Sequence, residues 1–334
     1  MTKILVTGGL GYIGSHTVVE LLQNGFDVVV VDNLNNSSIE FKERIERIAQ
    51  KEFSFYEIDV CQTSELNVVF ENEKIDGIIH FAAYKAVGES VELPIKYYQN
   101  NIGGLISLLD CMKKHDVRNI VFSSSCTVYG DTKNSPIKEN EPIAEAISPY
   151  GTTKIIGEQI LFDFAKVTPS KVVSLRYFNP VGAHQSALIG ELPLGVPSNL
   201  VPYITQTAAG IRAKLTIFGN DYNTPDGTNI RDFIHVVDLA KAHVKAIDFA
   251  SKNDFSVEVF NLGTGTGSSV TEVVNAFERV NNIKLNYEYG QRRAGDVEQI
   301  WADATKAKEK LGWQTELGLD EMMLTAWEWQ KTLL

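Results

Sequence analysis

The stretch KILVTGGLGYIG, residues 3–14, decides the fold. Its apolar start predicts a short strand ending at Thr7, and the glycines that follow are typical of a tight turn leading into a helix. Gly9, Gly11 and Gly14 have GxGxxG spacing, and Gly8, Gly11 and Gly14 form a nested GxxGxxG. In this context backbone N–H groups and the positive end of the helix dipole face a pyrophosphate. The stretch therefore predicts a dinucleotide site.

Asp32 lies at the end of the second predicted strand, eighteen positions after Gly14. A carboxylate there can accept a hydrogen bond from a ribose 2′-hydroxyl and repels a 2′-phosphate. The neighbouring Asn33 supplies no cation that would accommodate such a phosphate. The sequence thus favours NAD over NADP. A P-loop is excluded because no Gly-Lys-Ser/Thr follows the glycines.

Short β-branched runs alternate with helical patterns in the first half of the chain, which predicts a doubly wound parallel α/β sheet of the Rossmann type. The expected strands are Lys3–Thr7, Asp27–Val31, Ser54–Ile58, Gly77–His80, Asn119–Ser123 and Val172–Arg176. The expected helices are Ile13–Asn24, Ile39–Gln50, Glu65–Phe70, Val91–His115 and Tyr150–Val167.

From about Pro180 onward, frequent prolines and glycines divide the chain into short pieces. Regular patterns return at Val237–Ala250, Glu258–Leu262, Thr271–Asn281 and Ala304–Leu311. We therefore expect an NAD-binding Rossmann domain over residues 1–180 and a smaller C-terminal mixed α/β substrate lobe over 181–334. Parts of 230–262 are expected to return to the Rossmann sheet.

The composition narrows the class of protein. The 334 residues carry 31 Lys+Arg against 42 Asp+Glu, a net charge of -11, which argues against nucleic acid or an anionic membrane as the main partner. Three scattered cysteines without a CxxC fit a reducing compartment, so a cytoplasmic location is expected. The chain begins without an export signal, and no run approaches the ~18 apolar residues of a membrane span. No metal-binding spacing is present, so no metal is expected.

Tyr150 and Lys154 have YxxxK spacing, which puts both side chains on one face of a helix. A second such pair, Tyr129 and Lys133, follows the fifth strand directly and lacks the helical pattern. A tyrosine of ordinary pKa ~10 is a poor base at neutral pH, but a nearby ammonium and a cationic nicotinamide would favour the phenolate. The hydroxyls at 123–125 end the fifth strand, where ligands bind in open α/β sheets. Tyr150 is therefore the candidate general base, with a strand-end serine bridging it to the substrate.

Eight motifs carry a resemblance to a known family. They are TGGLGYIG (7–14), HFAAYKAVGES (80–90), SSSCTVYG (123–130), SPYGTTK (148–154), RYFNPVGAH (176–184), FGNDYNTPDGT (218–228), RDFIHVVDLA (231–240) and RRAGD (292–296). Together they resemble the extended short-chain dehydrogenase/reductase family and, within it, the UDP-glucose 4-epimerase branch. The resemblance runs in register from about residue 2 to residue 330.

The resemblance implies an NAD-dependent isomerase with Tyr150, Lys154 and Ser125 as catalytic residues. Implied NAD contacts are Gly8, Gly11, Tyr12, Ile13, Gly14, Asp32, Asn33, Leu34, Asn35, Asn36, Ser37, Asp59, Val60, Phe81, Ala82, Ala83, Lys85, Asn100, Ser125, Tyr150, Lys154 and Phe178. Implied UDP-sugar contacts are Ser125, Tyr150, Asn179, Asn199, Leu200, Thr216, Phe218, Arg231, Arg293, Asp296 and Ile300. Asp59 would reach the adenine and Lys154 the nicotinamide ribose.

The implied reaction interconverts UDP-galactose and UDP-glucose through a transient 4-keto sugar and bound NADH, in a homodimer formed through the helices 91–115 and 150–167. The two arginines fit an independent argument, because an acidic protein needs local guanidinium groups to hold a pyrophosphate. Taken singly, each arginine has a simpler interpretation, a surface ion pair with Asp232 or Asp296.

Several alternatives stay open. Ile300 takes the position that in this family limits room for an N-acetyl group, and isoleucine is intermediate in size, so UDP-GlcNAc/UDP-GalNAc epimerisation is an alternative. UDP-pentose or UDP-uronate epimerisation is another, and a non-catalytic NAD-binding protein is a third. A 4,6-dehydratase is disfavoured because Cys126 and Thr127, not a pair of carboxylates, follow Ser125. Cys126 stands where many relatives have alanine and is expected to pack.

Overall fold

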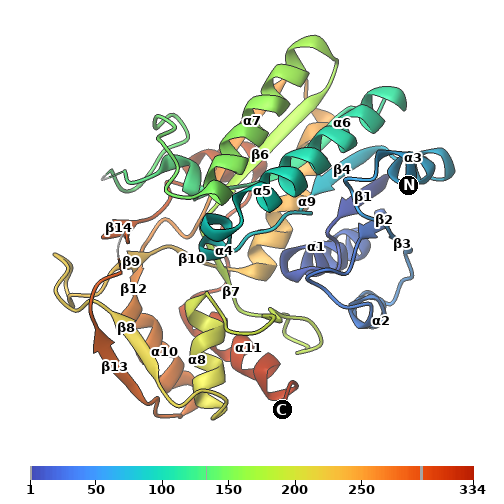
Figure 1. The fold of residues 1–334 in the computed structure, drawn as a ribbon. Coiled ribbons are helices and arrows are strands. Elements are labelled where there is room, and N and C mark those ends of the chain that lie inside the picture. Colours follow the sequence, from blue (N-terminus) through green and yellow to red (C-terminus); the bar gives the residue numbers. More distant parts are fainter. Residues whose placement is uncertain (1, 133, 294–295) are drawn as a thin grey trace.

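Seven parallel strands form the central sheet in the computed structural model, which describes residues 2–132, 134–293 and 296–334. The order across the sheet is β11-β6-β5-β4-β1-β2-β3 (Figure 1). The strands are β1 (Lys3–Thr7), β2 (Asp27–Asp32), β3 (Ser54–Glu57), β4 (Gly77–His80), β5 (Asn119–Ser125), β6 (Lys171–Tyr177) and β11 (Val257–Leu262). The doubly wound fold predicted from the sequence is confirmed.

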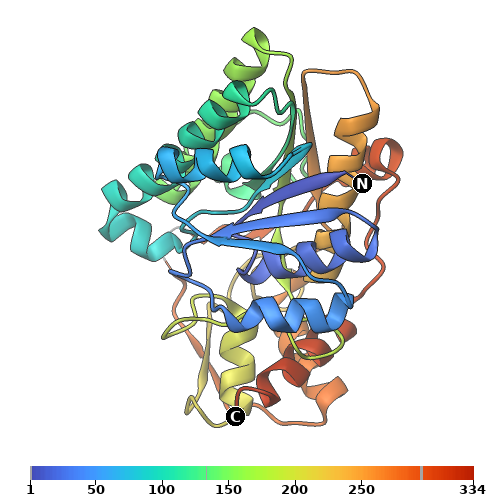
Figure 2. The ribbon, with the colours of Figure 1, turned by 90° about the vertical axis from the view of Figure 1, so that its right-hand side faces the viewer.

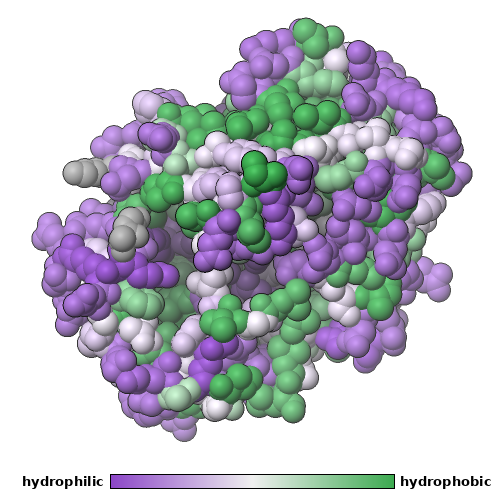
Figure 3. All heavy atoms as spheres, viewed as in Figure 1, coloured by the Kyte–Doolittle hydropathy of each residue, from purple (hydrophilic) through white to green (hydrophobic). Residues whose placement is uncertain are grey.

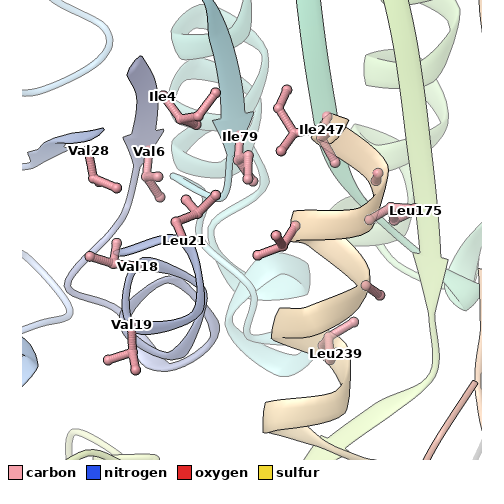
Figure 4. Close-up of a cluster of buried hydrophobic side chains, with 14 of the residues drawn as sticks. Ile4, Val6, Val18, Val19, Leu21, Val28, Ile79, Leu175, Leu239 and Ile247 are labelled. Atoms are coloured by element: carbon pink, nitrogen blue, oxygen red, sulfur yellow. The ribbon is translucent and has the colours of Figure 1, made fainter. Parts of the chain in front are cut away.

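Helices cover both faces of the sheet (Figure 2). Successive strand residues point to opposite faces, so Ile4 and Val6 of β1 join one core while Leu5 joins the other. The first core contains apolar residues of α1 (Tyr12–Gln23), α2 (Glu40–Ala49) and α9 (Val236–Lys252), and Figure 4 shows part of it. The second contains residues of α3 (Thr63–Asn72), α6 (Gly103–Lys114) and α7 (Pro149–Val167). Burial on both faces explains the nearly continuous aliphatic runs of the strands.

The single helix predicted over Val91–His115 is wrong. The chain instead forms α4 (Val87–Glu92), α5 (Pro94–Tyr97), a π-helical turn (Tyr98–Ile102) and then α6. Proline disfavours helical geometry in the residue before it, and Leu93 has φ −126° and ψ 55°. The apolar periodicity continues through the break, which is why sequence spacing alone did not reveal it.

The second half of the chain contains three small sheets. β7 (Asn179–Val181) pairs with β10 (Phe233–His235), and β8 (Leu215–Phe218) pairs with β13 (Tyr287–Gly290). β9 (Ile230–Arg231) lies between β12 (Ser268–Ser269) and β14 (Gln299–Ile300). A third core joins β7, β8, β10 and β13 to α8 (Leu200–Ala208), α10 (Val270–Asn281) and α11 (Leu319–Lys331). The sequence analysis did not predict α8 or α11.

The chain crosses between the two halves. β11 pairs in parallel with β6, so a segment that lies between β10 and β12 in the chain completes the large sheet. The predicted helix Ala304–Leu311 ends in a π-helical turn, Ala307–Leu311, which is followed by Gly312 in left-handed geometry. Among the described helices, none combines the length and the hydropathy that a membrane-spanning segment needs.

Candidate active site

Two glycines of the turn are required by close packing within the protein's own backbone. Gly8 has φ +69°, and a Cβ there would lie 2.8 Å from the backbone nitrogen of Ala82. A Cβ on Gly14 would lie 2.1 Å from the carbonyl oxygen of Gly8. The helix α1 begins at Tyr12 after Gly11, with no side-chain cap and no acidic residue in its first turn. Its first N–H groups are therefore free for an anion, and the cradle fits a pyrophosphate.

Asp32 joins the glycine turn to the loop after β2. Its Oδ2 accepts a hydrogen bond from the Leu10 N–H at 3.0 Å. Its Oδ1 accepts bonds from the Leu34 N–H at 3.0 Å and from the Ser37 hydroxyl at 2.8 Å. A carboxylate has about four acceptor sites, so Asp32 can still accept a ribose hydroxyl. The predicted residues around 32–37 thus form one hydrogen-bonded loop, whose exposed part includes Asn35 and Asn36.

The ends of β2 and β3 are tied together. The Asn33 side chain donates to Asp59 Oδ2 at 3.2 Å, and the other oxygen of Asp59 accepts the Cys61 N–H at 2.9 Å. Val60 between them is buried. These contacts place Asp59 and Val60 beside the Asp32 loop, as an adenosine site requires.

The end of β4 contributes Phe81, Ala82 and Ala83 to the same edge of the sheet. Lys85 follows them and lies 2.9 Å from Glu191 and 5.7 Å from the centre of the Tyr12 ring. The Tyr12 hydroxyl donates to the carbonyl of Gly182 at 2.6 Å. Asn100 donates to Asn101 at 2.9 Å from the π-helical turn. The sequence analysis missed Glu191, which also accepts a bond from Asn199 at 2.9 Å.

The catalytic pair lies on α7. Ser148 caps this helix by accepting the Gly151 N–H at 3.2 Å, and Pro149 fits its first turn. The Lys154 ammonium donates to the carbonyl oxygen of Ser123 at 2.6 Å and lies 5.8 Å from the centre of the Tyr150 ring. Ser125 ends β5 and is buried. Helix α7 and strand β5 therefore bring the three predicted catalytic residues to one place.

Burial dominates the proton chemistry of this pair. It raises the pKa of Tyr150 well above 10, and hydrogen bonding with Ser125 acts in the opposite direction. Burial also lowers the pKa of Lys154 to about 8. The phenolate expected from the sequence is thus disfavoured in the protein alone, because a buried charge loses its hydration. Positive charge that enters with a nicotinamide ring would offset this cost.

The second YxxxK pair has a structural role at Tyr129. Its hydroxyl donates to Asn261 Oδ1 at 2.6 Å and accepts a bond from Arg176 at 3.0 Å. The ring is fully buried. Lys133 lies outside the described residues, as do Ala294 and Gly295 of the RRAGD motif.

A second group of charges gathers among the small sheets. Arg231 lies 3.7 Å from Asp296, and Arg293 donates to the same carboxylate at 3.2 Å. The Arg293 guanidinium also lies 4.8 Å above the ring of Phe218. Two guanidinium groups share one carboxylate, so one positive charge remains for an anion. Asp232 is not a partner of Arg231, since its buried carboxylate accepts the backbone N–H groups of Thr264 and Ala302.

The remaining predicted substrate residues lie at the joints between elements. Asn179 donates to the carbonyl of Asp232 at 3.1 Å, and Leu200 begins α8, which has no side-chain cap. Thr216 lies on β8, two residues before Phe218. Ile300 packs in one small cluster with Cys126 and Phe178, which follow the ends of β5 and β6. The surface is hollowed between the sheet and the small lobe (Figure 3).

Comparison with known proteins identifies the family. A family model described as GDP-mannose 4,6 dehydratase matches residues 5–325. The UDP-glucose 4-epimerase of Haemophilus influenzae is 53% identical over 98% of this chain and 97% of its own, and that of Bacillus subtilis is 51% identical over 98% and 97%. The chain belongs to the UDP-glucose 4-epimerase family.

Solved structures of UDP-glucose 4-epimerases have the same fold. That of Stenotrophomonas maltophila, with bound NAD and formylated UDP-arabinopyranose, superimposes with a TM-score of 0.98 at 46% identity over 100% of this chain and 99% of that one. That of Bifidobacterium longum, in complex with NAD+ and UDP, gives 0.95 at 49% identity over 99% and 98%. UDP-glucose 4-epimerases are NAD-dependent isomerases, as the resemblance of the eight motifs implied.

Cys126 of the SSSCTVYG motif also lies beside the candidate site. Cys126 was expected to pack, and it lies against the Ile300 cluster. Burial raises the pKa of its thiol to about 12. Because the thiolate is the reactive form, Cys126 is not a nucleophile at neutral pH.

Proposed function

We propose that this protein interconverts UDP-galactose and UDP-glucose with NAD as its resident cofactor. The observation that carries the proposal is the position of Tyr150, Lys154 and Ser125. Ser125 lies at the carboxyl end of β5, and Tyr150 and Lys154 lie in the first two turns of α7. All three are on the edge of the sheet that also holds the glycine turn. Full-length likeness to UDP-glucose 4-epimerases supports this activity.

In the proposed reaction, Tyr150, Ser125 and Lys154 have different roles. NAD held at the glycine turn would supply the acceptor, and then the donor, of the hydride exchanged at C4 of the sugar. Tyr150 takes the proton of the 4-hydroxyl and returns it to the 4-keto oxygen. Ser125 orients that hydroxyl, and the Lys154 ammonium stabilises negative charge on the phenol. Burial excludes water from this exchange.

The substrate must be held at one end and free at the other. Arg231 and Arg293 hold the pyrophosphate, and Asn179 and Asn199 also bind the UDP-sugar. The hexose has to turn over between loss and return of hydrogen at C4. A firm grip on one sugar face would stabilise that state and slow the turn.

The two halves of the chain have separate tasks in this proposal. Residues 1–180, completed by β11, hold NAD, and residues 181–334 hold the UDP-sugar. The protein works in the cytoplasm, where its three free cysteines stay reduced.

The protein acts as a homodimer. Apolar side chains are exposed on the segments α4 to α6, including Val91 at 61% and Ile95 at 64%. An exposed apolar patch of this kind is typical of a contact between subunits. Gel filtration should give twice the chain mass of 37.1 kDa, and elution as a monomer contradicts the dimer.

The activity is tested with purified protein and no added NAD. UDP-galactose and, separately, UDP-GalNAc are supplied, and the anomeric protons are followed by NMR. UDP-glucose in the first tube establishes the epimerase and shows that NAD co-purifies. UDP-GlcNAc in the second tube shows that Ile300 leaves room for the N-acetyl group. No conversion in either tube after NAD is added contradicts the hexose substrate and favours pentose or uronate sugars.

A further inference from the structure

Glu158 is a buried carboxylate that the reaction described above does not use. It lies on α7, one turn after Lys154 and two turns after Tyr150, and is 0% exposed. Its Oε1 accepts bonds from the hydroxyls of Ser124 at 2.6 Å and Ser174 at 2.8 Å. Arg176 donates to both of its oxygens, at 2.9 Å and 2.6 Å. One side chain thus ties α7 to both β5 and β6.

The same strand end is bound to α7 at two successive residues. The carbonyl of Ser123 accepts the Lys154 ammonium at 2.6 Å, and the hydroxyl of Ser124 donates to Glu158 at 2.6 Å. Successive strand side chains point to opposite faces. Because Ser124 is held against α7, the orientation of Ser125 beside it is fixed as well.

All three guanidinium nitrogens of Arg176 donate hydrogen bonds. Its remaining nitrogen donates to the Tyr129 hydroxyl at 3.0 Å and to the carbonyl of Glu139 at 3.3 Å. A buried ion pair is weak support for stability, because both charges lose their hydration. Apolar residues of similar volume would often hold the same elements together with no loss of folding stability. Because stability alone does not require the Glu158–Arg176 pair, we examine whether it serves the catalytic site.

We propose that Glu158, held by Arg176, is a positioning residue that fixes Lys154 and Ser125 around Tyr150 and favours the charged form of Lys154. The inference rests on the proposed epimerase activity. Glu158 is the neighbouring charge that raises the pKa of Lys154 against the effect of burial. Its removal should lower that pKa further below about 8.

Other titratable groups surround the pair. His80, at the end of β4, has its pKa lowered partly by the charge of Lys154. Tyr177, Cys126 and Tyr97 each raise the pKa of Tyr150. All of them are unchanged in the variants below, so a shift from the wild type reports the loss of the Glu158–Arg176 pair.

The test compares two double variants with the wild type. E158Q/R176M removes both charges and keeps an acceptor for Ser124 and Ser174. E158L/R176M removes the charges and the hydrogen bonds. The matched control is E258Q, which neutralises a carboxylate of β11 that pairs with Lys306 and Lys310, away from α7.

The alkaline limb of kcat/KM should move about 0.5 to 1 pH unit lower in E158Q/R176M. In E158L/R176M, kcat at pH 7 should fall about 10- to 100-fold, because small misplacements are costly in catalysis, while KM for UDP-galactose changes less than about threefold. E258Q should leave both unchanged.

Unfolding gives a readout without turnover. The pKa of Lys154 is about 8 when folded, below its ordinary 10.5, so this group adds stability as pH rises above about 8. That rise should begin at lower pH in E158Q/R176M.

Each outcome separates the inference from the proposed function. A wild type that does not epimerise UDP-galactose contradicts the proposed function. An active wild type, with folded double variants that match it in pH profile and kcat, overturns the positioning role. Failure of both double variants to fold also overturns it, since the pair would then be required by the fold itself.

Discussion

The proposed NAD side (residues 1–180 with β11) and the proposed UDP side (the other residues of 181–334) are built differently. The glycine turn, the Asp32 loop and the Tyr150 helix rest on long parallel strands with cores on both faces. On the UDP side, Arg231 lies on a two-residue strand, while Phe218 is 40% exposed and the Arg293 side chain 56%. A cofactor that stays bound suits a rigid frame. A substrate that enters, turns and leaves suits side chains that can adjust.

The largest effect is expected where the two sides meet, at Tyr150. Tyr150→Phe removes the proton acceptor and keeps the ring, so kcat should fall about 1000-fold, within the range for general acid–base catalysis. The affinities for NAD and UDP should stay within about twofold, measured by calorimetry. A variant that retains a tenth of wild-type turnover would assign the base elsewhere.

The next largest expected effect is the loss of folding stability at acid pH, caused by buried histidines. Burial lowers the pKa of His16 and His80 to about 3 and that of His243 to about 4. The unfolded chain binds protons near pH 6.5 and the folded one does not, so stability is complete above that pH and is lost as pH falls toward 4. From pH 7 to 5.5 the loss should be about 1 kcal/mol per histidine, roughly 3 to 4 kcal/mol together.

Urea unfolding at the two pH values measures this loss. His243→Phe, which has no proton to gain, should reduce it by about 1 kcal/mol, the remainder coming from the other buried histidines, His235 included. Equal stability of the wild type at pH 7 and 5.5 would show that these histidines are protonated in the folded protein.

The glycine turn should distinguish the two sides directly. Gly14→Ala puts a Cβ 2.1 Å from the Gly8 carbonyl oxygen, so the turn must shift. NAD affinity should fall about 100-fold, equivalent to about 2.7 kcal/mol, with UDP affinity unchanged. The control is Gly88→Ala, where no atom lies within 4 Å of the new Cβ. Loss of UDP binding in the Gly14 variant would mean that the two sides are not independent.

The smallest effect concerns the arginine pair. Arg231→Met should weaken UDP binding about tenfold, and Arg293→Met by less, because the Arg231 side chain is 18% exposed and Arg293 is 56% exposed. NAD binding should not change in either variant. Calorimetric titration with UDP measures both. A larger loss from Arg293 would assign the stronger phosphate contact to the more exposed side chain.

The sequence predicted the NAD side far better than the UDP side. The bounds of Lys3–Thr7 and Gly77–His80 agree with the structure, because both are short aliphatic strands bounded by turn residues. The break at Pro94 was hidden by continuous apolar spacing. Helix α11 was missed, although its apolar residues at 319, 322, 323 and 326 have helical spacing.

The candidate site shows the same contrast. The glycine turn, Asp32 and the Tyr150–Lys154 pair follow from spacing within one or two elements. The partnership of Lys85 with Glu191 joins positions 106 residues apart, and no local pattern records it. The bond of Ser124 to Glu158 likewise depends on how α7 lies against β5.

The sequence by itself determined the sheet, the cofactor turn and the placement of Tyr150 and Lys154 on one helix face, because each depends on periodicity or on a backbone geometry that few residues allow. Only the tertiary structure decided that Arg231 and Arg293 share Asp296, that burial raises the pKa of Tyr150, and that Glu158 accepts a hydrogen bond from Ser124 of β5. Charges and hydration depend on neighbours in space, and those neighbours come from distant parts of the chain.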